Sequence, residues 1–245
     1  MPRRNRGPLE ELIGEIVGGV RAPGEALPRE AALAEQFGVS RGITREVMRA
    51  LEERGLVNVK HGIGSSVAPR ERWDTLDPLV LAALLPSDRG PAVLMEFLET
   101  RRIIEVEAAG LAAERATDED LTRLDEAYTA LEDAAARAAA NPAAEQRYLE
   151  ADVNYHQVIM GITHNAVLCS LIARIHSAIL EARVPTARPD LRADQGLPEH
   201  AKIRTAIRSR NVSAARRAMR DHLTSVGANL DAWTERQKTS RTEAA

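Results

Sequence analysis

The sequence is poor in cysteine and in aromatic residues. Cys169 is the single cysteine, and aromatics make up 3% of the 245 residues. One cysteine excludes an intramolecular disulfide and a cysteine-rich zinc module, and it fits a protein of the reducing cytoplasm. The chain also lacks a run of roughly 18 apolar residues and an apolar signal core near its start, so we expect no membrane span and no leader. With a net charge of −3, any surface that binds nucleic acid must be local.

What the chain does contain favours helices. Hydrophobic residues make up 44% of the sequence, and most of them are Ala, Leu, Ile and Val. A length of 245 residues suits two modest domains. Apolar spacing and turn signals predict helices over 9–20, 29–38, 40–54, 76–85, 92–116, 118–139, 142–163, 166–184, 197–210 and 212–234. "LVNVKHGIGSSVA", after the third helix, predicts a small hairpin with glycines at its tip.

The helix predicted over 40–54 presents a ridge of arginines. Ser40 is a suitable N-cap, and at 100° per residue Arg41, Arg45 and Arg49 lie within about 80° of one another. Ile43, Val47, Ala50 and Leu51 form the opposite side, which we expect to pack inward. Arginine suits bidentate contacts with guanine edges and phosphates. A short helix, a tight turn and this second helix therefore predict a helix-turn-helix, with the hairpin as a wing. The alternative is a solvated charged face on which Glu46, Glu52 and Glu53 pair with the arginines.

The stretch from 23 to 67, "PGEALPREAALAEQFGVSRGITREVMRALEERGLVNVKHGIGSSV", closely resembles the winged helix-turn-helix of the GntR family of bacterial transcription regulators. The resemblance implies that Arg41, Arg45 and the wing-tip His61 contact DNA. We add their neighbours to the candidate DNA-binding set: Ser40, Thr44, Arg49 and Gly62. Many relatives carry arginine where this chain has Ala31, so one expected DNA contact is missing and the operator preference is expected to differ.

A second group of candidate residues lies in the C-terminal half. Asp152 and His156 are four residues apart and share one helix face. His200 and His222 lie on the last two predicted helices. Three histidines and a carboxylate suit a borderline divalent ion. Spacing alone does not bring these helices together, and a lone histidine on an amphipathic helix is more often structural. His164 and His176, which have no evident partner in the sequence, are interpreted as structural.

Residues 92–232 resemble the FCD domain, the all-helical effector domain of the FadR subfamily of the same regulators. The matching segments are "FLETRRIIEVEAAGLAAERAT", "D---H" at 152–156, "HN--L" at 164–168, "EH--I--AI" at 199–207 and "A----M--HL" at 214–223. The resemblance implies a metal site of Asp152, His156, His200 and His222, which would hold zinc or, alternatively, manganese, nickel or cobalt.

A site of one aspartate and three histidines leaves coordination positions open for a carboxylate effector. The resemblance places Arg101 in the effector pocket, where its guanidinium would bind the acid opposite the metal. The alternative is that Arg101 pairs with Glu105, one helical turn away. Arg183 is a weaker pocket candidate.

These observations predict a mainly α protein in four parts. Residues 1–70 form a winged helix-turn-helix with a β-hairpin wing, 71–91 a linker with a short helix, 92–235 an all-α antiparallel bundle for effector binding and dimerisation, and 236–245 a frayed tail. The predicted function is a ligand-responsive regulator, expected to be a repressor. It would bind a pseudo-palindromic double-stranded DNA operator as a homodimer and respond to a small organic acid such as a sugar acid. The rival hypotheses are a metal-dependent hydrolase, with Glu199 as general base, and a DNA-binding regulator with a purely structural metal.

Overall fold

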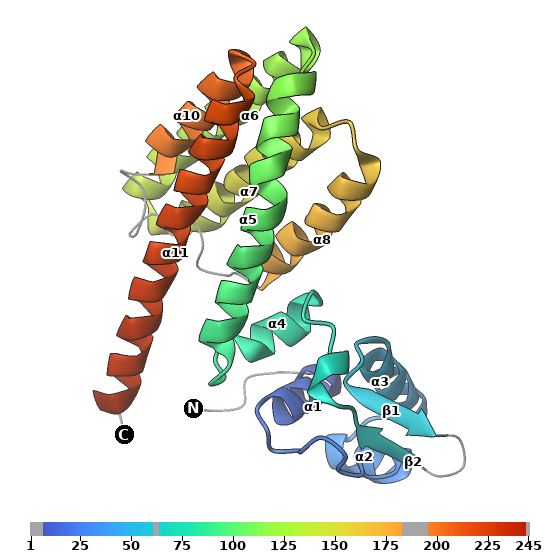
Figure 1. Ribbon diagram of the computed structural model, residues 1–245. Helices are drawn as coiled ribbons and strands as arrows, with labels where there is room; N and C mark the ends of the chain where they lie inside the picture. The colour runs from blue at the N-terminus through green and yellow to red at the C-terminus, as the bar shows by residue number, and fades with distance from the viewer. Residues whose placement is uncertain (1–6, 61–63, 183–195, 244–245) are drawn as a thin grey trace. The chain divides into compact units, whose positions relative to one another are not determined.

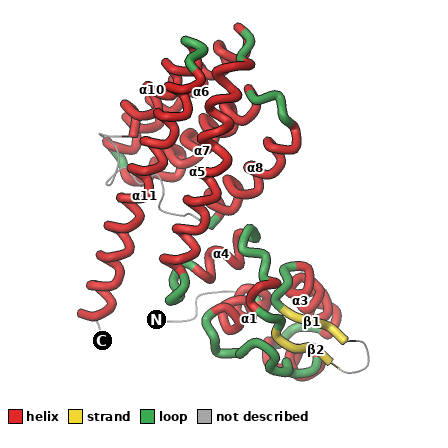
Figure 2. Tube along the Cα trace, viewed as in Figure 1, coloured by secondary structure: helices red, strands yellow, loops and turns green. Residues whose placement is uncertain are grey.

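The computed structural model describes residues 7–60, 64–182 and 196–243, which form two compact units, Met1–Gly90 and Pro91–Ala245. Figure 1 follows the chain through its elements, and Figure 2 separates the helices from the two strands. His61, Gly62 and Arg183 lie outside the described residues. No helix in the described part of the chain combines the length and the apolar character needed to cross a membrane.

The first unit is a helical domain with one hairpin. Its elements are α1 (Pro8–Val17), α2 (Glu30–Phe37), α3 (Arg41–Glu53), β1 (Val57–Lys60), β2 (Gly64–Val67), a 3-10 turn (Arg70–Arg72) and α4 (Pro78–Leu84). The strands are antiparallel and pair Val57 with Val67 and Lys60 with Gly64. This arrangement confirms the predicted winged helix-turn-helix.

The turn between α2 and α3 has the expected chemistry. Gly38 ends α2 in the left-handed conformation, at φ 65°, and Ser40 caps α3 by accepting a hydrogen bond from the Ile43 N–H at 3.3 Å. The buried side of α3 differs from the expectation at one position. Ile43 is 50% exposed, whereas Thr44 is buried together with Val47, Met48 and Leu51. Ile43 therefore lies on the solvent side of α3 and not on the buried side that helical periodicity predicted.

Most of the segment predicted as a linker, 71–91, packs as part of the first unit, which includes residues 71–90. α4 contacts α1, and Arg54 forms an ion pair with Asp77 at 3.0 Å. Trp73 is 6% exposed, and its Nε1–H donates to the Ala68 carbonyl at 3.2 Å. Gly55 permits this packing, because its φ is +69° and a Cβ there would lie 1.9 Å from the Arg72 carbonyl oxygen. The first unit accordingly extends to Gly90.

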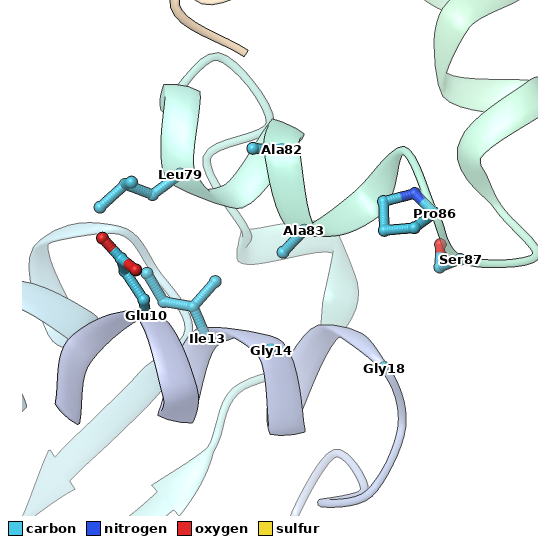
Figure 3. A pocket seen from close by; sticks show the side chains of 9 residues that line it. All are labelled: Glu10, Ile13, Gly14, Gly18, Leu79, Ala82, Ala83, Pro86 and Ser87. Atoms are coloured by element: carbon cyan, nitrogen blue, oxygen red, sulfur yellow. The ribbon is translucent and has the colours of Figure 1, made fainter. Parts of the chain in front are cut away.

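A cavity of about 320 Å³ lies between α1 and α4 (Figure 3). Ile13 and Gly14 line it from α1, and Leu79 and Ala83 line it from α4. These four residues are apolar, whereas Glu10 and Ser87 add polar groups, and the whole lining belongs to the first unit. The cavity is therefore separate from the candidate metal centre.

The second unit is built from helices alone among its described residues. They are α5 (Gly90–Arg115), α6 (Asp118–Ala140), a 3-10 turn (Pro142–Ala144), α7 (Glu145–Ile162), α8 (Ala166–Glu181), α10 (Gly196–Arg208) and α11 (Val212–Glu243). α6 packs against α7 and α10, α7 against α8, and α10 against α11. The short connections between α5 and α6, between α7 and α8 and between α10 and α11 reverse the chain direction, as in an antiparallel bundle (Figure 1). α11 extends to Glu243 and so includes residues 236–243 of the segment expected to be a frayed tail, 236–245.

Polar caps separate these helices where the sequence predicted breaks. Thr117 and Asp120 form a reciprocal capping box at the start of α6, and Asn165 caps α8. Asn211 accepts a hydrogen bond from the Ala214 N–H at 3.0 Å at the start of α11. The core between the caps is mainly aliphatic, and Tyr148 and Tyr155 are its largest fully buried side chains. These caps and this core fix the positions of α7, α10 and α11, the helices that carry the candidate metal ligands.

Candidate metal centre and DNA-binding helix

Three histidines from three helices meet in the interior of the second unit. His156 on α7, His200 on α10 and His222 on α11 are fully buried, and one ring nitrogen from each lies within 4.8 Å of the others. The Nε2 atoms of His156 and His200 are 3.4 Å apart. Three imidazole nitrogens this close together in an interior can serve as ligands of one metal ion.

Asp152 lies at the edge of this group. It is 4% exposed, sits one turn before His156 on α7, and its Oδ1 is 3.2 Å from His200 Nε2. The tertiary structure therefore brings together the three histidines of the predicted ligand set, and Asp152 contacts one of them, His200. A carboxylate oxygen and three imidazole nitrogens are the donors that a borderline divalent ion takes, so the residues fit such an ion.

The other ring nitrogen of each histidine faces an oxygen outside the group. His200 Nδ1 is 2.7 Å from the Gly196 carbonyl, and His222 Nδ1 is 3.1 Å from Glu199 Oε2. His156 Nδ1 is 2.6 Å from Glu105 Oε2, although its N–H is not aligned on that oxygen. Metal-bound histidines characteristically donate the second N–H to a carbonyl or carboxylate, which sets the tautomer and leaves Nε2 for the metal. His200 and His222 follow that pattern, and His156 places its Nδ1 beside a carboxylate without an aligned hydrogen bond.

Burial favours the neutral form of the His156 imidazole. Burial lowers the pKa of His156 by more than the neighbouring Glu105 carboxylate raises it. Burial would raise the pKa of Glu105, but Arg101 and His156 outweigh it and hold that pKa well below its usual range. His156 is thus a neutral base next to a fixed anion, which is the state in which an imidazole binds a metal.

Arg101 belongs to the same buried network. Its Nε donates to Glu105 Oε1 at 2.5 Å and its Nη2 to Glu105 Oε2 at 3.4 Å, so the alternative pairing within α5 is present. Burial would lower the pKa of Arg101, but Glu105 and Asp152 outweigh it and raise that pKa. Neither contact to Glu105 uses Nη1. Glu105 therefore fixes the Arg101 guanidinium beside the candidate metal ligands, and the Nη1 atom is not used in that contact.

Several contacts of the centre were not anticipated from the sequence. Glu199, considered there as a general base, instead contacts His222 and Ser225. The Tyr155 hydroxyl donates to the His200 carbonyl at 3.0 Å and anchors α10 to α7. His176 contacts Glu105 inside the unit, while His164 contacts Asp120 at the N-terminus of α6. No local spacing rule predicts these pairs, because their partners are 23 to 71 residues away.

The candidate DNA-binding residues of α3 differ in the exposed fraction of their side chains. Arg45 and Arg49 have side chains 72% and 70% exposed, and Arg41 is also exposed. Their local partners are weak surface pairs, Arg45 with Glu30 at 3.6 Å and Arg49 with Glu53 at 3.0 Å. Thr44 is 2% exposed and donates back to the Ser40 carbonyl, so it supports the start of α3 from inside.

A winged helix-turn-helix that presents arginines, joined to a helical bundle with a buried group of candidate metal ligands, defines a class of DNA-binding transcription regulator. Residues 9–67 match the bacterial regulatory proteins of the gntR family, and residues 96–225 match the FCD domain. The chain belongs to the GntR family and carries the FCD domain of its FadR-like branch.

Relatives along most of the length support this membership. The galactonate operon transcriptional repressor of Escherichia coli K12 is 35% identical over 207 residues, which cover 83% of this chain and 86% of the relative. The HTH-type transcriptional regulator LutR of Bacillus subtilis 168 is 31% identical and covers 90% and 98%. The solved structure of Streptococcus agalactiae GntR covers 90% of this chain and 97% of its own, at 28% identity and a TM-score of 0.50. These relatives are regulators, which confirms a regulator rather than an enzyme.

Proposed function

We propose that this chain is a repressor whose C-terminal unit binds a divalent metal ion and a small organic acid. The observation that carries the proposal is the buried group of His156, His200 and His222, each with its Nδ1 beside an oxygen. Zinc suits this ligand set best, and manganese, nickel or cobalt are the alternatives. When bound, the metal supplies a Lewis-acidic centre with open positions for an oxygen ligand.

The DNA-binding side of the proposal rests on α3. Arg41, Arg45 and Arg49 are exposed along one helix and would reach bases and phosphates in a major groove. Ser40 caps the helix that carries them, and Thr44 fixes its first turn. Two copies of the chain would place two such helices on a pseudo-palindromic operator, so we assign a homodimer that acts in the cytoplasm. His61 and Gly62, at the predicted wing tip, complete the set.

The acid would bind between the metal ligands and Arg101. Arg101 is held by Glu105 through Nε and Nη2, which leaves Nη1 as the nitrogen we assign to the acid's carboxylate. Arg183 remains a second candidate from the sequence. The relative named as a galactonate operon repressor favours a sugar acid as the effector class.

Coupling between the two units would make the protein a switch. Binding of the acid must favour a state of the dimer with lower operator affinity, and such coupling free energies are typically about 1–3 kcal/mol. The experiment combines metal analysis of protein purified without added metal with operator binding in the presence and absence of sugar acids. We expect about one ion per chain and an acid that weakens operator binding.

His156→Ala separates this function from its alternative. Under the proposal the variant binds operator but loses the metal and the response to the acid. If the metal is purely structural, the variant melts at lower temperature while the response to the acid persists in the folded fraction. Operator affinity that no sugar acid changes would overturn the repressor-effector proposal.

A further inference from the structure

His176 is a buried histidine that the metal centre does not use. It lies on α8, is 1% exposed, and its Nε2 is 3.3 Å from Glu105 Oε1. Its ring packs edge-on to that of His156, with centroids 6.1 Å apart. It is not a member of the described group of imidazoles whose nitrogens lie within 4.8 Å of one another. His176 therefore stands beside the metal centre, on the side of Glu105 and Arg101.

The contact with Glu105 determines which nitrogen of His176 carries the proton. Glu105 also accepts the Nε–H of Arg101, and an ionised carboxylate only accepts hydrogen bonds. The nitrogen facing it, Nε2, must therefore be the N–H of His176. In a neutral imidazole the other nitrogen, Nδ1, then has a lone pair and accepts.

The acceptor Nδ1 of His176 has no hydrogen-bond partner among the residues that the structure describes, and it is buried. Buried polar atoms are almost always hydrogen-bonded, and leaving one unsatisfied destabilises a fold. The missing partner must be a donor, because Nδ1 offers a lone pair. A carboxylate cannot supply it, whereas a hydroxyl group can.

We propose that His176 Nδ1 accepts a hydrogen bond from a hydroxyl group of the bound acid and so selects hydroxy acids over acids that lack this hydroxyl. This inference rests on the proposed function, because it concerns the acid bound beside Arg101 and the metal. Arg101 would take the carboxylate and His176 a hydroxyl, with Glu105 holding both side chains in place. Arg101 and His176 would thus recognise a carboxylate and a hydroxyl, the two groups that define a sugar acid.

The test uses two variants in the full-length, zinc-loaded protein, and the two introduced side chains resemble each other in size and branching. His176→Leu removes every polar atom, and His176→Asn places an amide oxygen near the position of Nδ1. Titration calorimetry compares galactonate with its monodeoxy analogues, and lactate with propionate. In the natural protein we expect loss of the contacted hydroxyl to weaken binding about tenfold.

In His176→Leu the preference for the hydroxylated acid should disappear, while His176→Asn should keep part of it. Because the preference is a ratio within one protein, a general loss of stability does not imitate it. An unchanged preference in His176→Leu, with acid still bound, overturns this inference and leaves the proposed function intact. So does a loss of zinc in His176→Leu, which would mean that His176 acts through the metal. Failure of the natural protein to bind any of these acids overturns both.

Discussion

Glu105 Oε2 lies 2.6 Å from His156 Nδ1, and both side chains are fully buried. The same carboxylate binds Arg101 and His176, so one residue of α5 connects the candidate metal centre with the candidate effector groups. Glu105 is therefore a positioning residue for His156, although it is not itself a member of the ligand set.

Glu105→Gln should weaken zinc binding about 10–100-fold, because the amide removes the charge that orients and polarises His156. Competition with a chromophoric chelator measures the affinity. Glu99→Gln, on the exposed face of the same helix, is the matched control and should bind zinc normally. Normal zinc affinity in a folded Glu105→Gln protein would mean that Glu105 serves packing only.

Removal of the metal should lower the melting temperature. At a free zinc concentration about 100-fold above Kd, binding contributes about 2.7 kcal/mol, which corresponds to roughly 5–10 °C in a chain of this size. Differential scanning calorimetry with and without a chelator measures the shift. His200→Ala provides the control, because its melting temperature should not respond to the chelator. Equal melting of the natural protein in both conditions would contradict a bound metal.

Asp120 should make stability depend on pH in the acid range. Burial would raise the pKa of this carboxyl, but hydrogen bonds from Thr117 and Arg123 outweigh it and lower the pKa to about 2. A folded pKa below the unfolded value of about 3.9 stabilises the fold above about pH 4, and the contribution is lost as pH falls toward 2. Since Arg123 and His164 are half-exposed, we expect about 1–2 kcal/mol.

The check for Asp120 is urea unfolding of the natural protein and of Asp120→Asn. The difference between them should be largest near neutral pH and should shrink by about half at about pH 3. A difference that stays constant between these conditions would show that the capping geometry, rather than the charge of Asp120, is what stabilises α6.

Gly55→Ala should destabilise the first unit by about 2–4 kcal/mol, because the position has φ +69° and an added Cβ meets the Arg72 carbonyl. Gly14→Ala is the matched control. It lies within α1 with open space at its Cβ, and the change should stabilise by about 0.5–1 kcal/mol. Chemical denaturation monitored by tryptophan fluorescence, with Trp233 replaced by phenylalanine so that Trp73 is the single reporter, distinguishes them. Equal effects would contradict the close approach at Gly55.

Arg45→Ala should weaken operator binding by about 1–3 kcal/mol, as expected for an arginine at a base edge or a phosphate. Its side chain is 72% exposed, so the fold should be unaffected. Fluorescence anisotropy at several salt concentrations measures both the affinity and its salt slope. Arg137→Ala, an exposed arginine of the second unit, is the control. An unchanged affinity for Arg45→Ala would move the DNA contact elsewhere on α3.

Local chemistry made most helix boundaries predictable. Ser40, Thr117 and Asn165 are caps in the structure because a side-chain oxygen beside a helix start satisfies a free N–H whatever the rest of the fold does. The exposure of Ile43 was not predictable in this way. Which side of α3 faces inward depends on the packing of α1 against it, and helical periodicity leaves that rotation free by about one residue.

Local sequence patterns specified the two modules and their secondary structure, because capping and apolar periodicity operate over a few residues. The i, i+4 spacing singled out only Asp152 and His156, and the full candidate ligand set followed from the resemblance to the FCD domain. Only the tertiary structure brought His156, His200 and His222 to one point, since they belong to three helices. It also decided that Glu105 joins His156 to Arg101 and His176, and that segment 71–91 packs with the first unit. Such contacts depend on how the helices pack across the core, and no short stretch of sequence contains that information.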